Sequence, residues 1–467
     1  MDKMADVLGR AGAWCGQNKY LSAIKNAFQN FMPLTIAGAI GVLWCNVLVN
    51  ETTGLGMFFK PIMALDFLNP AFQAVNFCTI SCITVGITLG IAQEIGIWNM
   101  GAERAGYIPG LVGLAAWLSV TNTSHMVEGA KDAFTGIAGN ELGATGLFTG
   151  MIIGVLSVEL FCFFEKQDAL KIKMPEQVPP GVARAFEVLV PATITLIITA
   201  CIGSACYNLT GLYLNDVIKN GVQGPLGAVG ATVPGVMIIY LVIMLFWLVG
   251  IHGNNMLSAV KEALFTPLAL ENVEKFNKGE KPTNIINMYA LQMCGEFGGS
   301  GVTIGLVIAI MIFGKREDNK AIATLSLVPG LFNINETVTF GIPMVLNPIL
   351  GIPFVVAPLI TIIIGYVLTV IGFCPVACLT VPWTTPPIVF GFLACGASVM
   401  GAVTQAILIV VSTVIYVPFL ISYEKYQNKT LDIREGYKKK IEQIDRAILD
   451  INNNLDKMYM DKLRGVL

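Results

Sequence analysis

The stretch 232–251, TVPGVMIIYLVIMLFWLVGI, is twenty residues long and contains no charged side chain. A run of this length is sufficient to cross the hydrocarbon core of a bilayer as an α-helix. It is followed directly by His252, Gly253, Asn254 and Asn255, so an ionisable ring and two amides stand beside a glycine. The stretch therefore predicts a membrane-spanning helix that ends at a polar site.

The composition of the whole chain favours the same class of protein. Of its 467 residues, 55% are hydrophobic and only 13% are charged, whereas soluble chains average about 25% charged residues. A water-soluble fold of this size could not cover its surface with so few charges. Lys and Arg number 29 against 31 Asp and Glu, giving a net charge of -2, so the chain has no basic excess for nucleic-acid phosphates. We therefore expect an integral membrane protein with no nucleic-acid partner.

Further apolar runs divide the chain into spans. Ten are long enough to cross a bilayer or nearly so, and they lie at 30–50, 73–95, 106–121, 144–164, 187–208, 232–251, 299–314, 350–372, 385–399 and 402–422. The stretches 253–301 and 321–348 are apolar but broken by proline and glycine. Broken segments at membrane depth mark transporter binding sites. The prediction is an all-α polytopic membrane protein with about ten transmembrane helices and two re-entrant hairpins.

Changes in polarity suggest five parts. They are an amphipathic cytoplasmic segment (1–29), a five-span bundle (30–208), a linker with an amphipathic helix (209–231), a second bundle holding the broken segments (232–423) and a charged cytoplasmic helical tail (424–467).

Lysine and arginine predict the sidedness of these parts. The N-terminal region, the loops 165–185 and 261–281, and the tail are rich in Lys and Arg, whereas 51–72 and 122–143 carry one lysine each. We therefore expect both termini in the cytoplasm.

The tail carries ten Lys/Arg and eight Asp/Glu. Its apolar residues step by three and four along one helix face, at Ile441, Ile444, Ile448, Ile451, Leu455 and Met458. This spacing is typical of a helix with one apolar seam. We favour a solvated helix that packs on its own protein, with self-association or docking of a soluble partner as alternatives.

Two ionisable residues are the main candidates for chemistry. His252 ends a strongly apolar span, and Glu336 lies in the run FNINETV within a broken segment. Ionisable groups at membrane depth are functional candidates, because burying them unpaired costs several kcal/mol. The alternatives are a histidine hydrogen-bonded inside the bundle and a glutamate that caps a helix. The only other histidine, His125, lies in a polar run expected outside.

Neighbouring residues suggest a sugar site. Asn254, Asn333 and Asn335 offer donors and acceptors for hydroxyl groups, and Gly253 allows a ligand to approach closely. Trp247 and Trp383 provide flat rings for the apolar face of a sugar, unless they belong to an interfacial belt. Glu296, in the glycine-rich GEFGGSG, is a weaker candidate whose alternative is a structural partner.

These motifs carry a resemblance to a known family. They are YLSAIK at 20–25, MPLTI at 32–36, GIHG at 250–253, NINE at 333–336 and VPWTTPP at 381–387. In this order they resemble the membrane component, enzyme IIC, of the bacterial phosphoenolpyruvate-dependent sugar phosphotransferase system, in its lactose/cellobiose/chitobiose family. The resemblance covers roughly residues 17–423.

The resemblance implies a sugar permease of the bacterial inner membrane. It implies a homodimer formed through the five-span bundle and a C-terminal bundle that carries one sugar in an elevator-like motion. His252 and Glu336 would line the sugar site near the hydroxyl that becomes phosphorylated. Either group could accept the hydroxyl proton as general base; we favour Glu336 as the hydrogen-bond acceptor and His252 as the orienter, with the reverse assignment as the alternative. The phosphate would come from a cysteine of a soluble IIB partner, supplied in turn by IIA. The chain would thus contribute a sugar site to a phosphotransferase complex. Because no metal-ligand cluster or P-loop is present, we expect neither a metal nor another cofactor.

Two departures bear on the subtype. The family motif continues with proline where this chain has Thr337, so the hairpin tip and the sugar subtype can differ from the usual family pattern. The tail is too short for a fused phosphocysteine domain and contains no cysteine. These features favour a separate IIB chain and a β-linked disaccharide of the cellobiose or diacetylchitobiose type.

Two other functions are compatible with the same residues. In a proton-coupled secondary sugar transporter, Glu336 and His252 would form a proton relay. In a sensor with a transporter-like shell, the tail would dock a regulator. Unmodified sugar inside vesicles would favour the proton-coupled transporter. Intact transport after deletion of 430–467 would indicate that the tail serves signalling or assembly.

Overall fold

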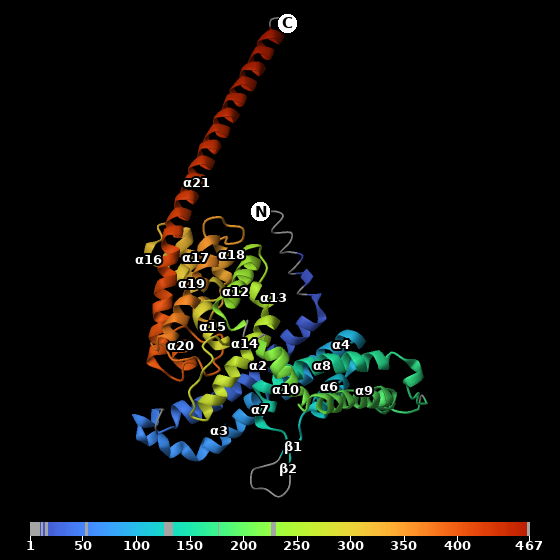
Figure 1. The fold of residues 1–467 in the computed structure, drawn as a ribbon. Coiled ribbons are helices and arrows are strands. Elements are labelled where there is room, and N and C mark those ends of the chain that lie inside the picture. Colours follow the sequence, from blue (N-terminus) through green and yellow to red (C-terminus); the bar gives the residue numbers. More distant parts are fainter. Residues whose placement is uncertain are drawn as a thin grey trace.

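The two halves of the chain form two helical bundles that pack side by side (Figure 1). This computed structural model describes residues 10, 13–14, 17–51, 55–125, 134–175, 177–225 and 230–464. Apart from one pair of two-residue antiparallel strands, β1 (Ser124–His125) and β2 (Phe134–Thr135), the described residues form helices, turns and loops. The prediction of an all-α fold is therefore confirmed, while residues 1–9, 11–12 and 15–16 of the expected N-terminal segment lie outside the described part.

The N-terminal bundle surrounds α4. Its α-helices are α2 (Lys19–Leu43), α3 (Asn69–Asn76), α4 (Ile83–Met100), α5 (Ala102–Ala105), α6 (Ile108–Val120), α7 (Gly139–Leu142), α8 (Ala144–Glu165) and α9 (Pro180–Thr210). α4 packs against α2, α6 and α8. Ile83, Ile87, Ile91 and Ile95 of α4 are fully buried and four residues apart, so one face of the helix forms the centre of the bundle.

Short turns of 3₁₀- or π-helix extend or connect these helices. They are η1 (Trp44–Leu48), η2 (Leu55–Met57), η3 (Lys60–Leu68), η4 (Phe77–Ser81) and η5 (Asp168–Leu170). α2 has no break at residue 30. The expected surface segment and the start of the first span are therefore one continuous helix.

The C-terminal half is arranged around α19. Its elements are α12 (Val233–Leu248), α13 (Gly253–Met256), α14 (Ser258–Asn277), α15 (Met288–Gly295), η7 (Ser300–Val302), α16 (Ile304–Phe313), α17 (Glu317–Leu331), α18 (Glu336–Gly341), α19 (Gly351–Val370), α20 (Val389–Ala394) and α21 (Val399–Arg464). The connecting elements α10 (Leu214–Ile218) and η6 (Lys219–Gln223) pack against α8 of the N-terminal bundle. α12, α15 and α21 pack against α19, and α14 packs against α2 and α8 of the other half. α14 is therefore a main contact between the halves.

The helices account for the predicted apolar runs with one exception. Among the described residues, five helices are long and apolar enough to cross a membrane, and two bent pairs bring the number to seven. α6 and α12 are apolar but shorter. The run 385–399 was wrongly predicted to span, because only the six residues of α20 are helical there. Pro386 and Pro387 precede it, and Ile388 and Gly396 have positive φ angles, which end a helix on both sides.

The broken stretch 321–348 forms a helical hairpin. α17 ends at Leu331, a tight turn follows, and α18 begins at Glu336. The stretch 253–301 is different, because it contains the twenty-residue helix α14 before the break at Gly295. The two broken stretches bring their glycine- and asparagine-rich turns together in the C-terminal half.

Polar contacts distinguish the two ends of the body. Lys19 pairs with Glu159 at 2.6 Å at one end, whereas Asn277 accepts a hydrogen bond from Asn46 (3.2 Å) at the other end of α2. Lys278 therefore lies at the end opposite Lys19. The assignment of 261–281 to one cytoplasmic loop is wrong, because α14 crosses the body and Lys261 is buried at its beginning.

The last helix, α21, continues far beyond the body and runs through the tail as far as Arg464 (Figure 1). Glu424 marks the point where it leaves, since its carboxylate accepts hydrogen bonds from the backbone N–H groups of Lys315 (2.9 Å) and Arg316 (3.3 Å). Beyond it, Tyr437, Ile441 and Ile444 are more than half exposed. The tail therefore does not pack on its own subunit, contrary to the interpretation that we favoured.

Candidate sugar-binding site

A cavity of about 670 Å³ lies among the broken segments of the C-terminal half. Its walls come from the helix starts at α13, α14 and α18, the turn after α15, and the loop before α20. The lining residues are His252, Asn254, Asn255, Lys261, Glu262, Gln292, Glu296, Gly299, Ser300, Asn333, Ile334, Asn335, Glu336, Trp383 and Phe390. Seven of the nine residues predicted for the site therefore line one cavity.

His252 and Glu336 face each other across this cavity. The distance between His252 Nε2 and Glu336 Oε1 is 3.8 Å, which exceeds that of a direct hydrogen bond. The backbone N–H of Asn255 donates to His252 Nδ1 at 3.2 Å. In a neutral ring the proton must then lie on Nε2, the nitrogen that faces Glu336. The pair thus offers a donor and an acceptor to a group placed between them.

Trp247 and Gly253 do not line the cavity, contrary to the expected sugar contacts. Trp247 is only 2% exposed, and its ring lies 4.4 Å from the His252 ring, centroid to centroid. A side-chain carbon on Gly253 would lie 2.0 Å from the backbone oxygen of Ile243. Both residues therefore lie outside the cavity lining and pack around His252, which fixes the position of its ring.

Asn333 and Asn335 hold the hairpin in place. The Asn333 amide nitrogen donates to the carbonyl oxygens of Trp383 (2.5 Å) and Thr385 (3.1 Å), and its oxygen accepts from the Gly298 N–H (2.6 Å). The Asn335 amide nitrogen donates to the Ser300 carbonyl at 2.8 Å. These amides are largely used within the protein, so their main effect is to position Glu336.

Glu296 is paired inside the protein. Its Oε1 accepts from the Tyr240 hydroxyl at 2.7 Å and forms an ion pair with Lys261. The exposed fractions of the two charged side chains are 8% for Lys261 and 17% for Glu296. A buried ion pair with a further hydrogen bond is a satisfied arrangement, which agrees with the structural alternative for Glu296.

Sequence reasoning missed several residues of the wall, above all Lys261, Glu262 and Gln292. Lys261 and Glu262 lie within an apolar broken stretch, so the rule that singled out His252 and Glu336 also applies to them. They were missed because 261–281 was assigned to a loop. Asn255, Ser300 and Gly299 could have been inferred from their neighbours.

Trp383 and Thr337 are two further residues that the sequence motifs singled out. Trp383 is 45% exposed at the rim of the cavity, where its ring is accessible to a ligand. Thr337 is the second residue of α18. An N–H at this position has no partner within the helix, and a proline would fit there as well. The backbone at the hairpin tip is therefore compatible with either residue.

Comparisons with known proteins agree on one family. The family "Phosphotransferase system, EIIC" matches residues 25–358. The oligo-beta-mannoside-specific EIIC component of Bacillus subtilis is 31% identical, over 98% of this chain and all of that protein. The cellobiose-specific EIIC component of Lactococcus lactis is also 31% identical, over 92% of this chain and 99% of that protein.

A solved structure is similar over most of its length. The crystal structure of the transporter ChbC, the IIC component of the N,N'-diacetylchitobiose-specific phosphotransferase system, has a TM-score of 0.82 and 28% identity. The alignment covers 90% of this chain and 97% of ChbC. The chain therefore belongs to the EIIC family of the phosphotransferase system and is a sugar permease of that system.

Proposed function

We propose that the chain transports a β-linked disaccharide of the cellobiose or diacetylchitobiose type and presents its 6-hydroxyl to a phosphorylated IIB partner. The relatives named for cellobiose and diacetylchitobiose support this sugar class. The cavity volume of about 670 Å³ also supports it, because small-molecule sites usually have volumes of roughly 300–1,000 Å³.

The observation that carries the proposal is the gap of 3.8 Å between His252 Nε2 and Glu336 Oε1. A sugar hydroxyl oxygen placed between them can lie about 2.7–2.9 Å from both atoms. It then donates to the Glu336 carboxylate and accepts from the His252 Nε2–H. This arrangement orients the hydroxyl and lets Glu336 take its proton as general base.

In the reaction, the sulfur–phosphorus bond of the IIB phosphocysteine breaks and an oxygen–phosphorus bond to the sugar forms. The hydroxyl proton passes to Glu336, and the cysteine leaves as a thiolate. Phosphoryl transfer depends chiefly on positioning and charge stabilisation. Glu336 and His252 position the sugar hydroxyl: Glu336 accepts its hydrogen bond, and His252 orients it.

The charges of the lining favour release of the product. Glu262, Glu296 and Glu336 supply three carboxyl groups, whereas Lys261 is the one ammonium group among the described lining residues. A neutral sugar is unaffected by this balance. The sugar phosphate carries negative charge, so its attraction to the site is weaker.

The assembly follows the family pattern. We infer a homodimer formed through the N-terminal bundle, with both termini in the cytoplasm and an elevator-like movement of the C-terminal half. IIB and IIA act from the cytoplasm of a bacterial cell whose inner membrane holds the protein. The start of α2 and the projecting part of α21 lie on one side of the body, which supports a common side for the two ends (Figure 1).

Membrane vesicles test this function. With phosphorylated IIB present, cellobiose should accumulate only as its phosphate, whereas uptake of unmodified sugar driven by a pH gradient would favour the proton-coupled transporter. A thermal-shift panel of cellobiose, diacetylchitobiose and lactose on the purified protein would identify the sugar. Stabilisation by lactose alone would contradict the proposed class.

A further inference from the structure

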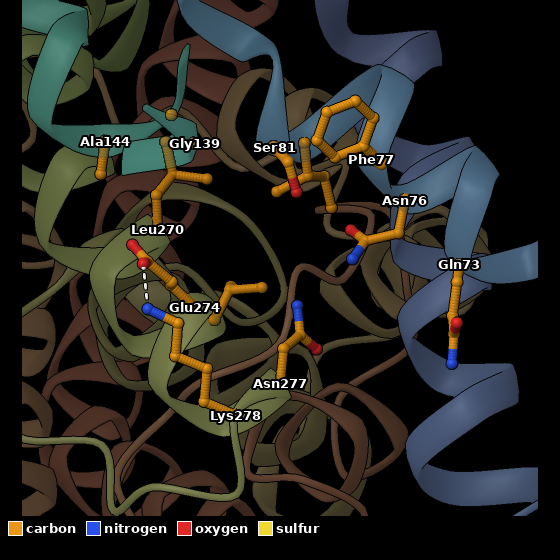
Figure 2. A pocket seen from close by; sticks show the side chains of 13 residues that line it. Gln73, Asn76, Phe77, Ser81, Gly139, Ala144, Leu270, Glu274, Asn277 and Lys278 are labelled. Carbon is orange, nitrogen blue, oxygen red and sulfur yellow. Dashed lines mark hydrogen bonds and ion pairs between the residues drawn. The ribbon is translucent and has the colours of Figure 1, made fainter. Parts of the chain in front are cut away.

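A second cavity, which we call the outer cavity, lies between the two halves of the chain (Figure 2). Its volume is about 720 Å³. One wall comes from α3, η4 and the start of α8, and the other from the last turns of α14. The lining residues are Gln73, Asn76, Phe77, Ile80, Ser81, Gly139, Gly143, Ala144, Leu270, Val273, Glu274, Asn277 and Lys278. None of them lines the cavity of His252 and Glu336.

Side-chain amides face the outer cavity from both halves. Asn76 points inward from one wall and Asn277 from the opposite wall (Figure 2). The Asn76 Oδ1 atom is buried and has no hydrogen-bond partner among the described residues. Asn277 Oδ1 accepts from Asn46 at 3.2 Å, and its amide nitrogen is directed into the cavity (Figure 2). The walls therefore bring amide groups of both halves to one space, and the protein leaves the oxygen of one of them without a partner.

The charges of the outer cavity favour a neutral ligand. Glu274 and Lys278 form an ion pair at 2.6 Å and are the two charged residues of the described lining. Their charges cancel, so the lining has no net attraction for an anion or a cation. The ring of Phe77 lies beside the amides and is 55% exposed. Amides next to an accessible aromatic face suit a ligand with hydroxyl groups on an apolar ring, which describes a sugar.

One face of α14 joins the outer cavity to the sugar-binding site. A smaller cavity of about 240 Å³ lies between α2 and α14. It shares Leu270 with the outer cavity, and it shares Glu262, Gln292 and Trp383 with the site. Leu270 and Glu262 are two turns apart on α14 and face the same way. The three cavities thus follow each other along the contact between the halves.

We propose that the outer cavity is a second carbohydrate site, which binds a disaccharide before it reaches His252 and Glu336. The inference rests on the proposed function, because it takes the same sugar as ligand. Its position at the end of α14 opposite Lys261 places it on the side from which the sugar arrives, since the expected external segments 51–72 and 122–143 lead into its wall.

The test compares the variants N76L and F77A of the full chain with V75A. Val75 is 37% exposed on the same helix but does not line the outer cavity, so V75A is a matched control. Uptake of cellobiose by right-side-out vesicles measures entry from outside. Phosphorylation of saturating cellobiose by the detergent-solubilised protein and IIB measures the site of His252 and Glu336. Thermal unfolding reports whether each variant folds.

We expect N76L and F77A each to raise the half-saturating cellobiose concentration for uptake about fivefold, the effect of a lost hydrogen bond or ring contact. Phosphorylation by the solubilised variants should stay within twofold of the unmodified protein, and V75A should change neither quantity. If both variants take up cellobiose as well as V75A does, the second site is overturned, while the proposed function is unaffected. An equal loss of uptake and phosphorylation in stably folded variants would overturn it as well. If the unmodified protein does not phosphorylate cellobiose at all, the proposed substrate is wrong. The second site, which is proposed for the same sugar, is then wrong as well.

Discussion

The amide nitrogen of Asn333 donates a hydrogen bond of 2.5 Å to the backbone carbonyl of Trp383, fifty residues further along the chain. This contact joins the tip of the α17–α18 hairpin to the loop before α20. Asn333 has a φ of +62°, a conformation that asparagine tolerates better than most residues. Glu336 and the exposed Trp383 ring thus depend on one side chain for their relative position.

Replacing Asn333 should therefore loosen the site. N333A removes three hydrogen bonds of the hairpin tip, and we expect a loss of about 2 kcal/mol in the free energy of unfolding. Sugar affinity should fall as well, because Glu336 and Trp383 are no longer held together. Thermal unfolding with and without cellobiose measures both effects. N347A, which removes an asparagine away from the cavity that bonds within its own loop, is the control. Unchanged sugar affinity in N333A would show that the clamp is dispensable.

Glu336 should be indispensable for the chemistry. E336Q keeps the shape of the side chain but removes the proton acceptor, so sugar phosphorylation should fall at least 100-fold, while the melting temperature and the proposed dimer are preserved. IIB-dependent formation of sugar phosphate is the measurement. E317Q, at an exposed glutamate at the start of α17, should leave it unchanged. Near-normal turnover of E336Q would remove Glu336 from the mechanism.

The buried pair of Lys261 and Glu296 should behave as a unit. K261M leaves the Glu296 carboxylate with only the Tyr240 hydroxyl, and E296Q leaves the Lys261 ammonium without its counter-charge. Each single change should cost about 3–5 kcal/mol of stability, because an uncompensated buried charge remains.

The double variant K261M/E296Q should recover part of this loss, as coupled neighbours are not additive. Denaturation of the unmodified protein, the two single variants and the double variant in the same detergent gives the free energies for this double-mutant cycle. Strictly additive losses would show that the two groups do not interact.

The tail of α21 should be dispensable for transport. A chain truncated after Lys429 keeps Glu424 and its contacts with the backbone of Lys315 and Arg316, so uptake and phosphorylation should stay within twofold. E424A should instead destabilise the full chain by about 2 kcal/mol, since two backbone N–H groups and the Asn319 amide lose their acceptor. Loss of transport on truncation would assign the tail to the transport cycle rather than to signalling or assembly.

Local patterns predicted much of this protein. The scarcity of charge and the length of the apolar runs are sufficient for an all-α membrane fold, because each backbone polar group in a bilayer must be paired within its own segment. Proline and glycine located the breaks, and ionisable residues in apolar surroundings located His252 and Glu336. These features depend only on residues close together along the chain, so they can be recognised from the sequence alone.

Other features depend on which segments meet. The apolar run 385–399 looks like a span, but positive φ angles at Ile388 and Gly396 restrict it to a short helix. Lys261 looks like part of a charged loop, but it is buried beside Glu296 because α14 crosses the body. The predicted ring contact of Trp247 is replaced by packing behind His252.

The sequence by itself thus determined the class of fold, the family motifs and the two ionisable groups that we propose to meet a sugar hydroxyl. Only the tertiary structure decided the separation of 3.8 Å between His252 and Glu336, the ion pair of Lys261 and Glu296 in the same cavity wall and the outer cavity between the halves. The physical reason is that pairing of charges and shaping of cavities depend on contacts between segments far apart along the chain, which local composition and periodicity do not encode.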